Sequence, residues 1–222
     1  MPIPKARIML VDDHAMVRYG IASVINAQAD MEVFGEAGDV EGAVSMIKPD
    51  HCPDLVLIDL SLNGLSGFEL LKKLQTRFPS LPTLVVSMYD EKQYAERALR
   101  YGARGYVMKH EVWGVLLTAI RDVLAGKIYL SGHMSTSLLK RIATGGAESG
   151  PLVENLTPTE FEILHLIGAG HTSQEISELL HRSIKTIEVH RANIRKKLQL
   201  DDGADLNRFA ADWLQEFGGK PA

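Results

Sequence analysis

Apolar and polar positions alternate in blocks along the first half of the chain. Short apolar runs that end in turn residues occupy 7–11, 32–37, 54–58, 83–87 and 105–108. Between these runs the apolar residues recur at helical spacing, as Phe68, Leu71 and Leu74 do. Apolar strands that alternate with amphipathic helices indicate a parallel sheet covered on both faces. The pattern therefore predicts an α/β domain over residues 1–128, a doubly wound five-stranded parallel sheet.

The pattern changes after residue 128. Residues 131–143 favour a short helix, and the polar, Gly-rich segment 144–151 has the composition of a flexible linker. We therefore expect a linker over 129–151. The remaining residues, 152–222, show helical periodicity and no strand pattern, which predicts a small all-α domain of four helices.

Cap-forming residues mark where the helices of this second domain begin. Thr157 with Glu160, and Thr172 with Glu175, have the spacing of a capping box. In a capping box each side chain bonds a backbone N–H group that the start of the helix leaves free. Ser183 is placed to cap a third, longer helix. Short helices that start this sharply predict a compact bundle with tight turns.

Composition and charge narrow the class of protein. The 222 residues are 45% hydrophobic and 23% charged, which is typical of a globular protein. No apolar run approaches the roughly 20 residues that cross a bilayer, so we expect no membrane segment. The single cysteine, Cys52, excludes an intramolecular disulfide framework and favours a reducing, cytoplasmic compartment. The net charge of −4 argues weakly against nucleic-acid binding unless a local basic face exists.

Chemically active residues come at the ends of the predicted strands. Asp12 and Asp13 follow the first strand, Asp59 follows the third, Ser87 ends the fourth and Lys109 follows the fifth. Ligand sites in such sheets lie beyond the carboxyl ends of the strands, so we expect these side chains to share one crevice. Neighbouring carboxylates need a cation, and hard oxygen ligands suit Mg²⁺. With a lysine and a hydroxyl beside them, they predict a phosphoryl site in which Asp59 is the nucleophile.

The same residues lie in motifs that resemble those of a known family. The segments LVDDH (10–14), LVLIDLSLNGLSG (55–67), VVSMYD (85–90) and GARGYVMKH (102–110) are similar, in order and spacing, to the receiver domain of two-component response regulators. The resemblance implies a flavodoxin-like fold and phosphoryl transfer from a sensor histidine kinase to Asp59. It also implies that Mg²⁺ is bound by Asp13, by Asp59 and by the backbone carbonyl of Ser61, with Asp12 acting through water.

The resemblance implies that three further residues respond to the phosphoryl group. Lys109 would pair with its oxygens, Ser87 would move to hydrogen-bond one of them, and Tyr106 would swing inward behind Ser87. One position departs from the family: Asn63 stands where receivers usually have proline, so we expect a looser loop there. Tyr89 lies two residues past Ser87, where a ring is expected to shield the phosphoryl group from water and slow its hydrolysis.

Uneven charge in the second domain indicates another functional surface. Residues 182–197 hold six cations and one anion, Glu188. The apolar residues of this segment recur mainly at helical spacing, and those expected to face the bundle are Ile184, Ile187, Ile194 and Leu198. From charge and periodicity alone, a DNA-binding helix and an ordinary solvated helix are equally supported.

Residues 156–200 resemble the LuxR-type helix-turn-helix domain, through the blocks LTPTE, SQEIS, SIKTIEVH and IRKKL. In such domains the basic helix enters the major groove, where some side chains anchor phosphates and others meet base edges. Helical periodicity puts Arg195 and Lys196 on the outward face, and the resemblance places the other expected contacts at the DNA. The eight residues expected there are Lys185, Thr186, Glu188, Val189, His190, Ala192, Arg195 and Lys196. Many members have lysine in place of Glu188, and the carboxylate favours a cytosine amino group over a phosphate.

A receiver followed by a LuxR-type domain is the arrangement of NarL/FixJ response regulators. We therefore expect a DNA-binding transcription regulator and not an enzyme. Phosphorylation of Asp59 would promote homodimerisation and binding to double-stranded promoter DNA, with RNA polymerase as a further partner. The alternative is a regulator that binds DNA independently of phosphorylation and is controlled by protein contacts of its receiver. A phosphohydrolase is disfavoured, because Ser61 stands where haloacid-dehalogenase-type enzymes have a second aspartate.

Overall fold

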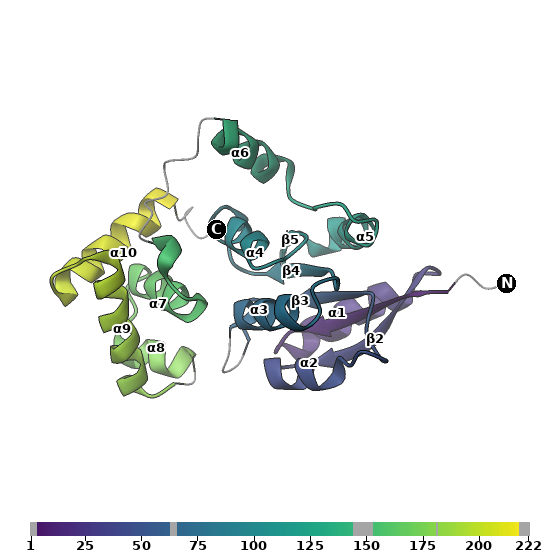
Figure 1. Cartoon of the computed structure of the whole chain (residues 1–222), viewed down its shortest axis with the longest axis horizontal. Coiled ribbons are helices and arrows are strands. Elements are labelled where there is room, and N and C mark those ends of the chain that lie inside the picture. The colour runs from purple at the N-terminus through teal and green to yellow at the C-terminus, as the bar shows by residue number, and fades with distance from the viewer. Residues whose placement is uncertain (1–3, 63–65, 144–152, 181, 218–222) are drawn as a thin grey trace. The chain divides into compact units, whose positions relative to one another are not determined.

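The computed structural model describes residues 4–62, 66–143, 153–180 and 182–217 (Figure 1). The chain divides between Met134 and Ser135 into an N-terminal and a C-terminal unit. The predicted domain limits at residues 128 and 151 stay predictions, and the Gly-rich linker segment 144–151 lies outside the described residues.

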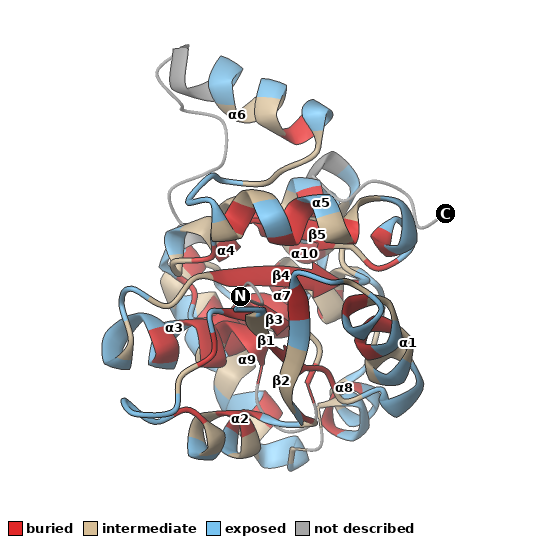
Figure 2. Cartoon of the chain, turned by 90° about the vertical axis from the view of Figure 1, so that its right-hand side faces the viewer, coloured by how far each residue is buried: buried red, intermediate tan, exposed pale blue. Residues whose placement is uncertain are grey.

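A parallel sheet forms the centre of the N-terminal unit. Its strands, in their order across the sheet, are β2 (Met31–Ala37), β1 (Ala6–Val11), β3 (Leu55–Ile58), β4 (Thr83–Ser87) and β5 (Tyr106–Met108). The register places Leu10 beside Leu57 and Ile58 beside Val85. The predicted five-stranded, doubly wound α/β fold is thus confirmed. Every residue of β3 and β4 is buried, because helices cover both faces of the sheet (Figure 2).

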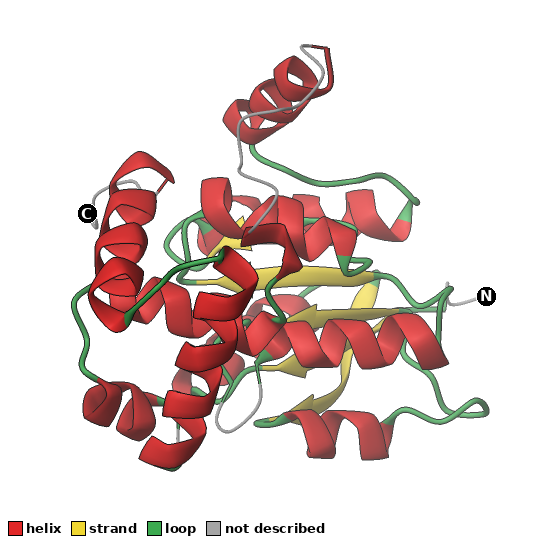
Figure 3. Ribbon diagram, turned by 60° about the vertical axis from the view of Figure 1, so that its left-hand side comes forward, coloured by secondary structure: helices red, strands yellow, loops and turns green. Residues whose placement is uncertain are grey.

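Helices α1 to α5 connect these strands and flank the sheet (Figure 3). Their bounds are α1 (Ala15–Asn26), α2 (Val40–Met46), α3 (Gly67–Arg77), α4 (Glu91–Arg100) and α5 (Val112–Leu124). Apolar residues of α1 and α5, such as Ile25 and Leu116, join alternate strand residues in one buried cluster. Helices α3 and α4 are joined by the stacked rings of Phe68 and Tyr94, whose centroids lie 6.2 Å apart. The helices therefore hold the strand ends, and the residues that follow them, in fixed positions.

The segment after α5 is tied to the sheet before it enters α6 (Gly132–Ala143). The amide of Tyr129 donates to the carbonyl of Arg104, and the amide of Tyr106 donates to the carbonyl of Tyr129. The amide of Ser131 donates to the Glu91 carboxylate at 2.8 Å. This segment thus adds to the free edge of β5 and contacts the first turn of α4.

The C-terminal unit consists of helices. Their bounds are the short 3-10 turn η1 (Val153–Asn155), α7 (Pro158–Gly168), α8 (Ser173–Leu179), α9 (Ile184–Leu198) and α10 (Gly203–Phe217). Both predicted capping boxes are present, at the starts of α7 and α8. Helix α7 packs against α9 and α10, and Gly168 allows its last turn to approach the carbonyl of Ala210. The predicted all-α domain of four helices is confirmed in the described residues.

The core of the C-terminal unit differs from the predicted one at a single position of α9. Ile187, Ile194 and Leu198 are buried as expected. Ile184 is 49% exposed, so the prediction that it faces the bundle is wrong. Ile184 is the first residue of α9, directly after the cap Ser183. Helical side chains point towards the N-terminus, and α9 has no earlier turn there that could cover Ile184.

Trp213 packs edge-on against Phe161 of α7, with ring centroids 5.4 Å apart, and so belongs to the contact between α7 and α10. None of the helices in the described part of the chain combines the length and apolar character that crossing a bilayer requires.

Candidate functional site

Asp59 lies directly after β3, at the carboxyl edge of the sheet. Its amide donates to the carbonyl of Val11, which fixes it beside the end of β1, where Asp12 follows. Asp59 is 2% exposed and Asp12 is 5% exposed. On the other side, the amide of Lys109 donates to the carbonyl of Ser87. The ends of β1, β3, β4 and β5 therefore bring the predicted residues into one crevice.

Lys109 pairs with both buried carboxylates and balances one of their two charges. Its Nζ donates to Asp59 Oδ2 at 2.7 Å and lies 2.7 Å from Asp12 Oδ2. A buried carboxylate without a cationic partner would be strongly destabilising, which explains why a lysine must reach this position. The lysine can turn from the carboxylates to a phosphoryl group without leaving the crevice, because its ammonium has three donors.

Burial and the neighbouring charges shift the pKa values of Asp59 and Lys109 in opposite directions. Burial raises the pKa of Asp59 to about 6, although the nearby Lys109 acts to lower it. For Lys109, burial alone would lower the pKa, but the carboxylates of Asp59 and Asp12 outweigh it and the pKa is raised. At neutral pH Asp59 is therefore mostly an anion and Lys109 a cation, as nucleophilic attack on phosphorus requires.

A group of carboxylates in the crevice fits a metal ion. Single ligand atoms of Asp12, Asp13, His14 and Asp59 all lie within 4.8 Å of one another. Asp13 Oδ1 is buried without a hydrogen-bond partner in the described residues, and His14 Nδ1 lies 2.7 Å from it. The amide of Ser61 donates to Asp59 Oδ1 at 3.2 Å, so Ser61 also lies at the site. Carboxylate oxygens with unused acceptor capacity can bind a divalent cation.

Sequence reasoning missed two residues that hold this acidic group. His14 contacts both Asp12 and Asp13, at 3.3 and 2.7 Å. The signal was its position directly after the paired aspartates. Arg18 donates to the backbone carbonyl of Asp12, from one turn into α1. No sequence pattern indicates this contact, because the acceptor is a backbone carbonyl six residues earlier and outside the helix.

Ser87 and Tyr106, the two residues predicted to act as a switch, are fully buried. The hydroxyl of Tyr106 donates to the carbonyl of Tyr89 at 2.8 Å, and burial raises the pKa of this phenol well above its usual value. The ring therefore already occupies the inward position that the sequence predicts for the phosphorylated state. The ring of Tyr89 stacks on Tyr94 of α4, with centroids 4.5 Å apart.

Gly67 brings the start of α3 against Asp59. A Cβ atom at Gly67 would lie 2.1 Å from the Asp59 carbonyl oxygen, so only glycine permits this approach. The amide of Gly67 donates to the carbonyl of Leu60 and closes the loop. Asn63, where the chain departs from the receiver pattern, lies outside the described residues.

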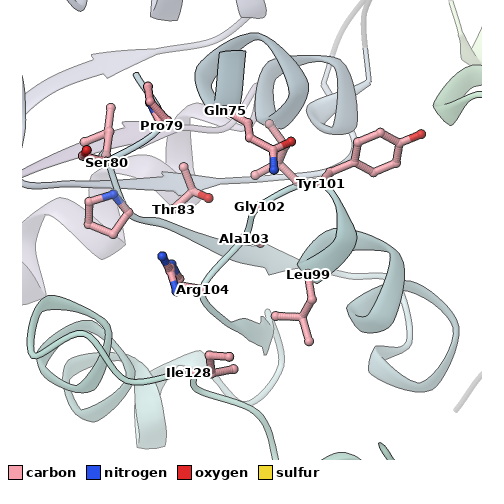
Figure 4. Close-up of a pocket in the computed structure, with 13 residues that line it drawn as sticks. Gln75, Pro79, Ser80, Thr83, Leu99, Tyr101, Gly102, Ala103, Arg104 and Ile128 are labelled. Atoms are coloured by element: carbon pink, nitrogen blue, oxygen red, sulfur yellow. The ribbon is translucent and has the colours of Figure 1, made fainter. Parts of the chain in front are cut away.

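A further cavity of the same unit lies away from this crevice. It encloses about 210 Å³ and is lined by residues that include Gln75, Thr83 and Arg104 (Figure 4). Thr83 begins β4 and Arg104 precedes β5, so the cavity is at the amino edge of the sheet. It is therefore separate from the crevice at the carboxyl edge.

Helix α9 presents most of the predicted DNA-contacting residues to solvent. Of the eight predicted, those classed as exposed are Lys185, Glu188, Val189, Ala192 and Lys196. Thr186, His190 and Arg195 are half-buried, so they can contribute only part of their surface. Val189 is 54% exposed, so its apolar side chain lies on the solvent face of α9.

Sequence reasoning missed two of the polar links that connect α9 to its neighbours. Ser173 of α8 donates to Glu188 Oε1 at 2.5 Å. Arg191 Nη2 donates to Asn207 Oδ1 of α10 at 2.9 Å, so this cation braces the bundle. The two residues of each link are fifteen or sixteen positions apart, and no local pattern indicates such a pairing.

Known protein families match both the part of the chain that holds the crevice and the part that holds α9. Residues 8–121 match the response regulator receiver domain, and residues 154–210 match the bacterial regulatory proteins of the luxR family. The chain belongs to the NarL/FixJ-type response regulators: it is a two-component transcriptional regulator with a LuxR-type DNA-binding domain.

Individual relatives support the same assignment over the full length. The oxygen regulatory protein NreC of Staphylococcus carnosus is 35% identical over 209 residues, covering 92% of this chain and 96% of that protein. RcsB from Salmonella enterica serovar Typhimurium, solved bound to promoter rprA with the phosphomimetic BeF3⁻, is 25% identical, with a TM-score of 0.60 over 94% of this chain and 99% of that one. A LuxR-family response regulator from Aurantimonas is 31% identical, with a TM-score of 0.58 over 63% of this chain and 99% of that one.

Proposed function

We propose that Asp59 accepts a phosphoryl group from a sensor histidine kinase. The carboxylate attacks phosphorus as the P–N bond of the donor phosphohistidine breaks, which forms an acyl phosphate. The observation that carries this proposal is the contact of Lys109 Nζ with both Asp59 and Asp12, at 2.7 Å each. The lysine stabilises the ionised nucleophile before transfer and is placed to pair with phosphoryl oxygens after it.

Mg²⁺ is the metal ion that this donor set suits best. Asp13, Asp59 and the Ser61 carbonyl would hold it directly and Asp12 through water, and when bound it would neutralise charge on the phosphoryl oxygens. Ser87 supplies a hydroxyl at the end of β4, and the buried Tyr106 lies beside it. Together they communicate the modification of Asp59 to the adjoining loop and to α4.

The phosphorylated protein binds promoter DNA as a homodimer through α9. The exposed cations Lys185 and Lys196 anchor phosphates, and Val189 and Ala192 face the bases. A structure of RcsB is described as two dimers bound to two parallel DNAs, which supports the dimer by analogy. We place this function in the cytoplasm, where RNA polymerase is a further partner and the free thiol of Cys52 is stable.

Phosphate-dependent DNA selection tests this function. The full-length protein, with and without BeF3⁻, is incubated with a random duplex library, and its mass in solution is measured by light scattering. We expect BeF3⁻ to produce a dimer and to enrich a two-part site, and Asp59→Asn to abolish both effects. Equal enrichment by Asp59→Asn and by the untreated wild type would instead support regulation independent of phosphorylation. Raising the salt concentration should weaken binding steeply, because phosphate contacts release counterions.

A further inference from the structure

The acidic residue Glu188 lies on the face of α9 that is otherwise basic and apolar. Its side chain is 57% exposed, and its neighbours on this face are Val189, one residue later, and Ala192, one turn later. Neither neighbour has a polar side-chain atom. Among these three, Glu188 is the only side chain that can form a hydrogen bond with a base edge.

Glu188 is held in place by a residue of the preceding helix. The hydroxyl of Ser173, the first residue of α8, donates to Glu188 Oε1 at 2.5 Å. The guanidinium of Arg191, which is itself anchored to Asn207 of α10, lies 3.9 Å from the same oxygen. A glutamate on a helix surface normally samples several rotamers, and fixing it costs conformational entropy. Ser173 and Arg191 already restrict the Glu188 side chain in the free protein, so less entropy is lost when Glu188 makes a contact with DNA.

We infer that Ser173 is a positioning residue that aims Glu188 at the amino group of a cytosine in the major groove. This inference rests on the proposed DNA-binding function. Phosphates repel a carboxylate, whereas cytosine presents its N4 amino group as a donor in the major groove. The contact with Ser173 uses Oε1, and a carboxylate has a second oxygen, Oε2, that can accept from the base. The pair thus specifies a C·G base pair at one position of each half-site.

Base preference, measured for matched variants, tests the inference. The full-length protein with BeF3⁻ selects sites from a random duplex library, and the affinity for single-base variants of the selected site is then measured. We expect the wild type to prefer C·G at one position per half-site. Glu188→Gln should shift that preference towards A·T, because an amide pairs with adenine. Ser173→Ala should weaken the preference for C·G at that position at least about threefold, with other positions and the salt dependence unchanged.

Two further variants separate positioning from packing. Ser173→Thr keeps the hydroxyl and should retain the C·G preference. Ser177→Ala is the matched control, because the Ser177 hydroxyl donates to the carbonyl of Gln174 within α8. Thermal unfolding of each variant shows whether the bundle is intact.

The outcomes distinguish this inference from the function on which it rests. If Ser173→Ala selects the same bases as the wild type, the serine only packs α8 against α9 and the inference is wrong, while the DNA-binding function stands. If Glu188→Gln changes no preference, Glu188 does not read a base, and the inference is again wrong. If the wild type selects no sequence at all, the proposed function itself fails.

Discussion

The crevice around Asp59 and the basic helix α9 both depend on single side chains whose partners lie far away in the sequence. Lys109 meets Asp59 across 50 residues, and Lys197 meets Glu160 across 37. In each pair a buried carboxylate is balanced by a lysine from another element. The consequences of removing one partner can therefore be stated for individual residues.

The aromatic ring of Tyr89 is expected to protect the phosphoryl group on Asp59. Its amide is held by the Ser87 hydroxyl at 3.3 Å, and its ring is stacked on Tyr94, so it cannot swing freely. Tyr89→Ala should open a path for water and speed the loss of phosphate at least about twofold, which is a small change in barrier. The measurement is the decay of the intact-mass signal of the phosphorylated protein. Met88→Ala, at a neighbouring side chain that is 67% exposed, is the control and should leave the rate unchanged.

Glu160 makes the C-terminal unit sensitive to acid. Burial would raise the pKa of Glu160, but hydrogen bonds from Lys197 and from Thr157 outweigh it and hold the pKa below the ordinary 4.5. The carboxylate therefore contributes stability that is complete above the unfolded-state pKa and is lost as the pH falls through the lower, folded-state value. Glu160→Gln should cost about 1.5–3 kcal/mol at pH 7, where the charge-assisted bonds are present. The cost should shrink below pH 4.5.

Urea unfolding across this pH range measures the effect. Asp205→Asn is a control, since the Asp205–Arg208 pair is exposed and should contribute little at any pH. A Glu160→Gln deficit that is the same at pH 3 and pH 7 would contradict the argument.

At the scale of elements, the start of α3 is set by its close approach to Asp59. Gly67→Ala would force a Cβ atom to within 2.1 Å of the Asp59 carbonyl oxygen, so the helix must shift. We expect a loss of about 2 kcal/mol in unfolding free energy, within the range measured for overpacking, together with slower phosphorylation. Gly114→Ala in α5 is the matched control, because nothing lies within 4 Å of its Cβ position and alanine favours a helix. If the two variants have the same unfolding free energy and the same rate of phosphorylation, the close approach of Gly67 does not position Asp59.

The first turn of α4 is linked to the segment that leads into α6. Glu91 is 5% exposed and accepts from the Ser131 amide. Glu91→Ala should leave this amide without its acceptor, and its hydrogen exchange should become about tenfold faster, equivalent to roughly one hydrogen bond. The exchange of β5 should stay as it is. Glu96→Ala, which removes an exposed ion pair with Arg100 later in α4, serves as the control.

At the scale of the whole molecule, the sequence predicts the fold and the phosphoacceptor crevice well. Continuous apolar strands end in Asp12, Asp59 and Ser87, and a parallel sheet necessarily brings such ends to one edge. The helix caps were equally predictable, because Thr157 and Thr172 act within one turn. Burial of Ile184 was wrongly predicted, since periodicity does not show that a first turn lacks a covering neighbour. The Ser173–Glu188 contact was missed because it depends on how two helices pack.

Phosphorylation of Asp59 underlies the proposed function, and the intact mass of the protein detects it. The full-length protein is incubated with acetyl phosphate and Mg²⁺ beside the Asp59→Asn variant. We expect a gain of roughly 80 Da, one phosphoryl group, in the wild type and none in the variant. The same gain in both proteins would place the group on another residue. No gain in either, even with a sensor histidine kinase as donor, would rule out phosphorylation of Asp59 and favour control of the receiver by protein contacts alone.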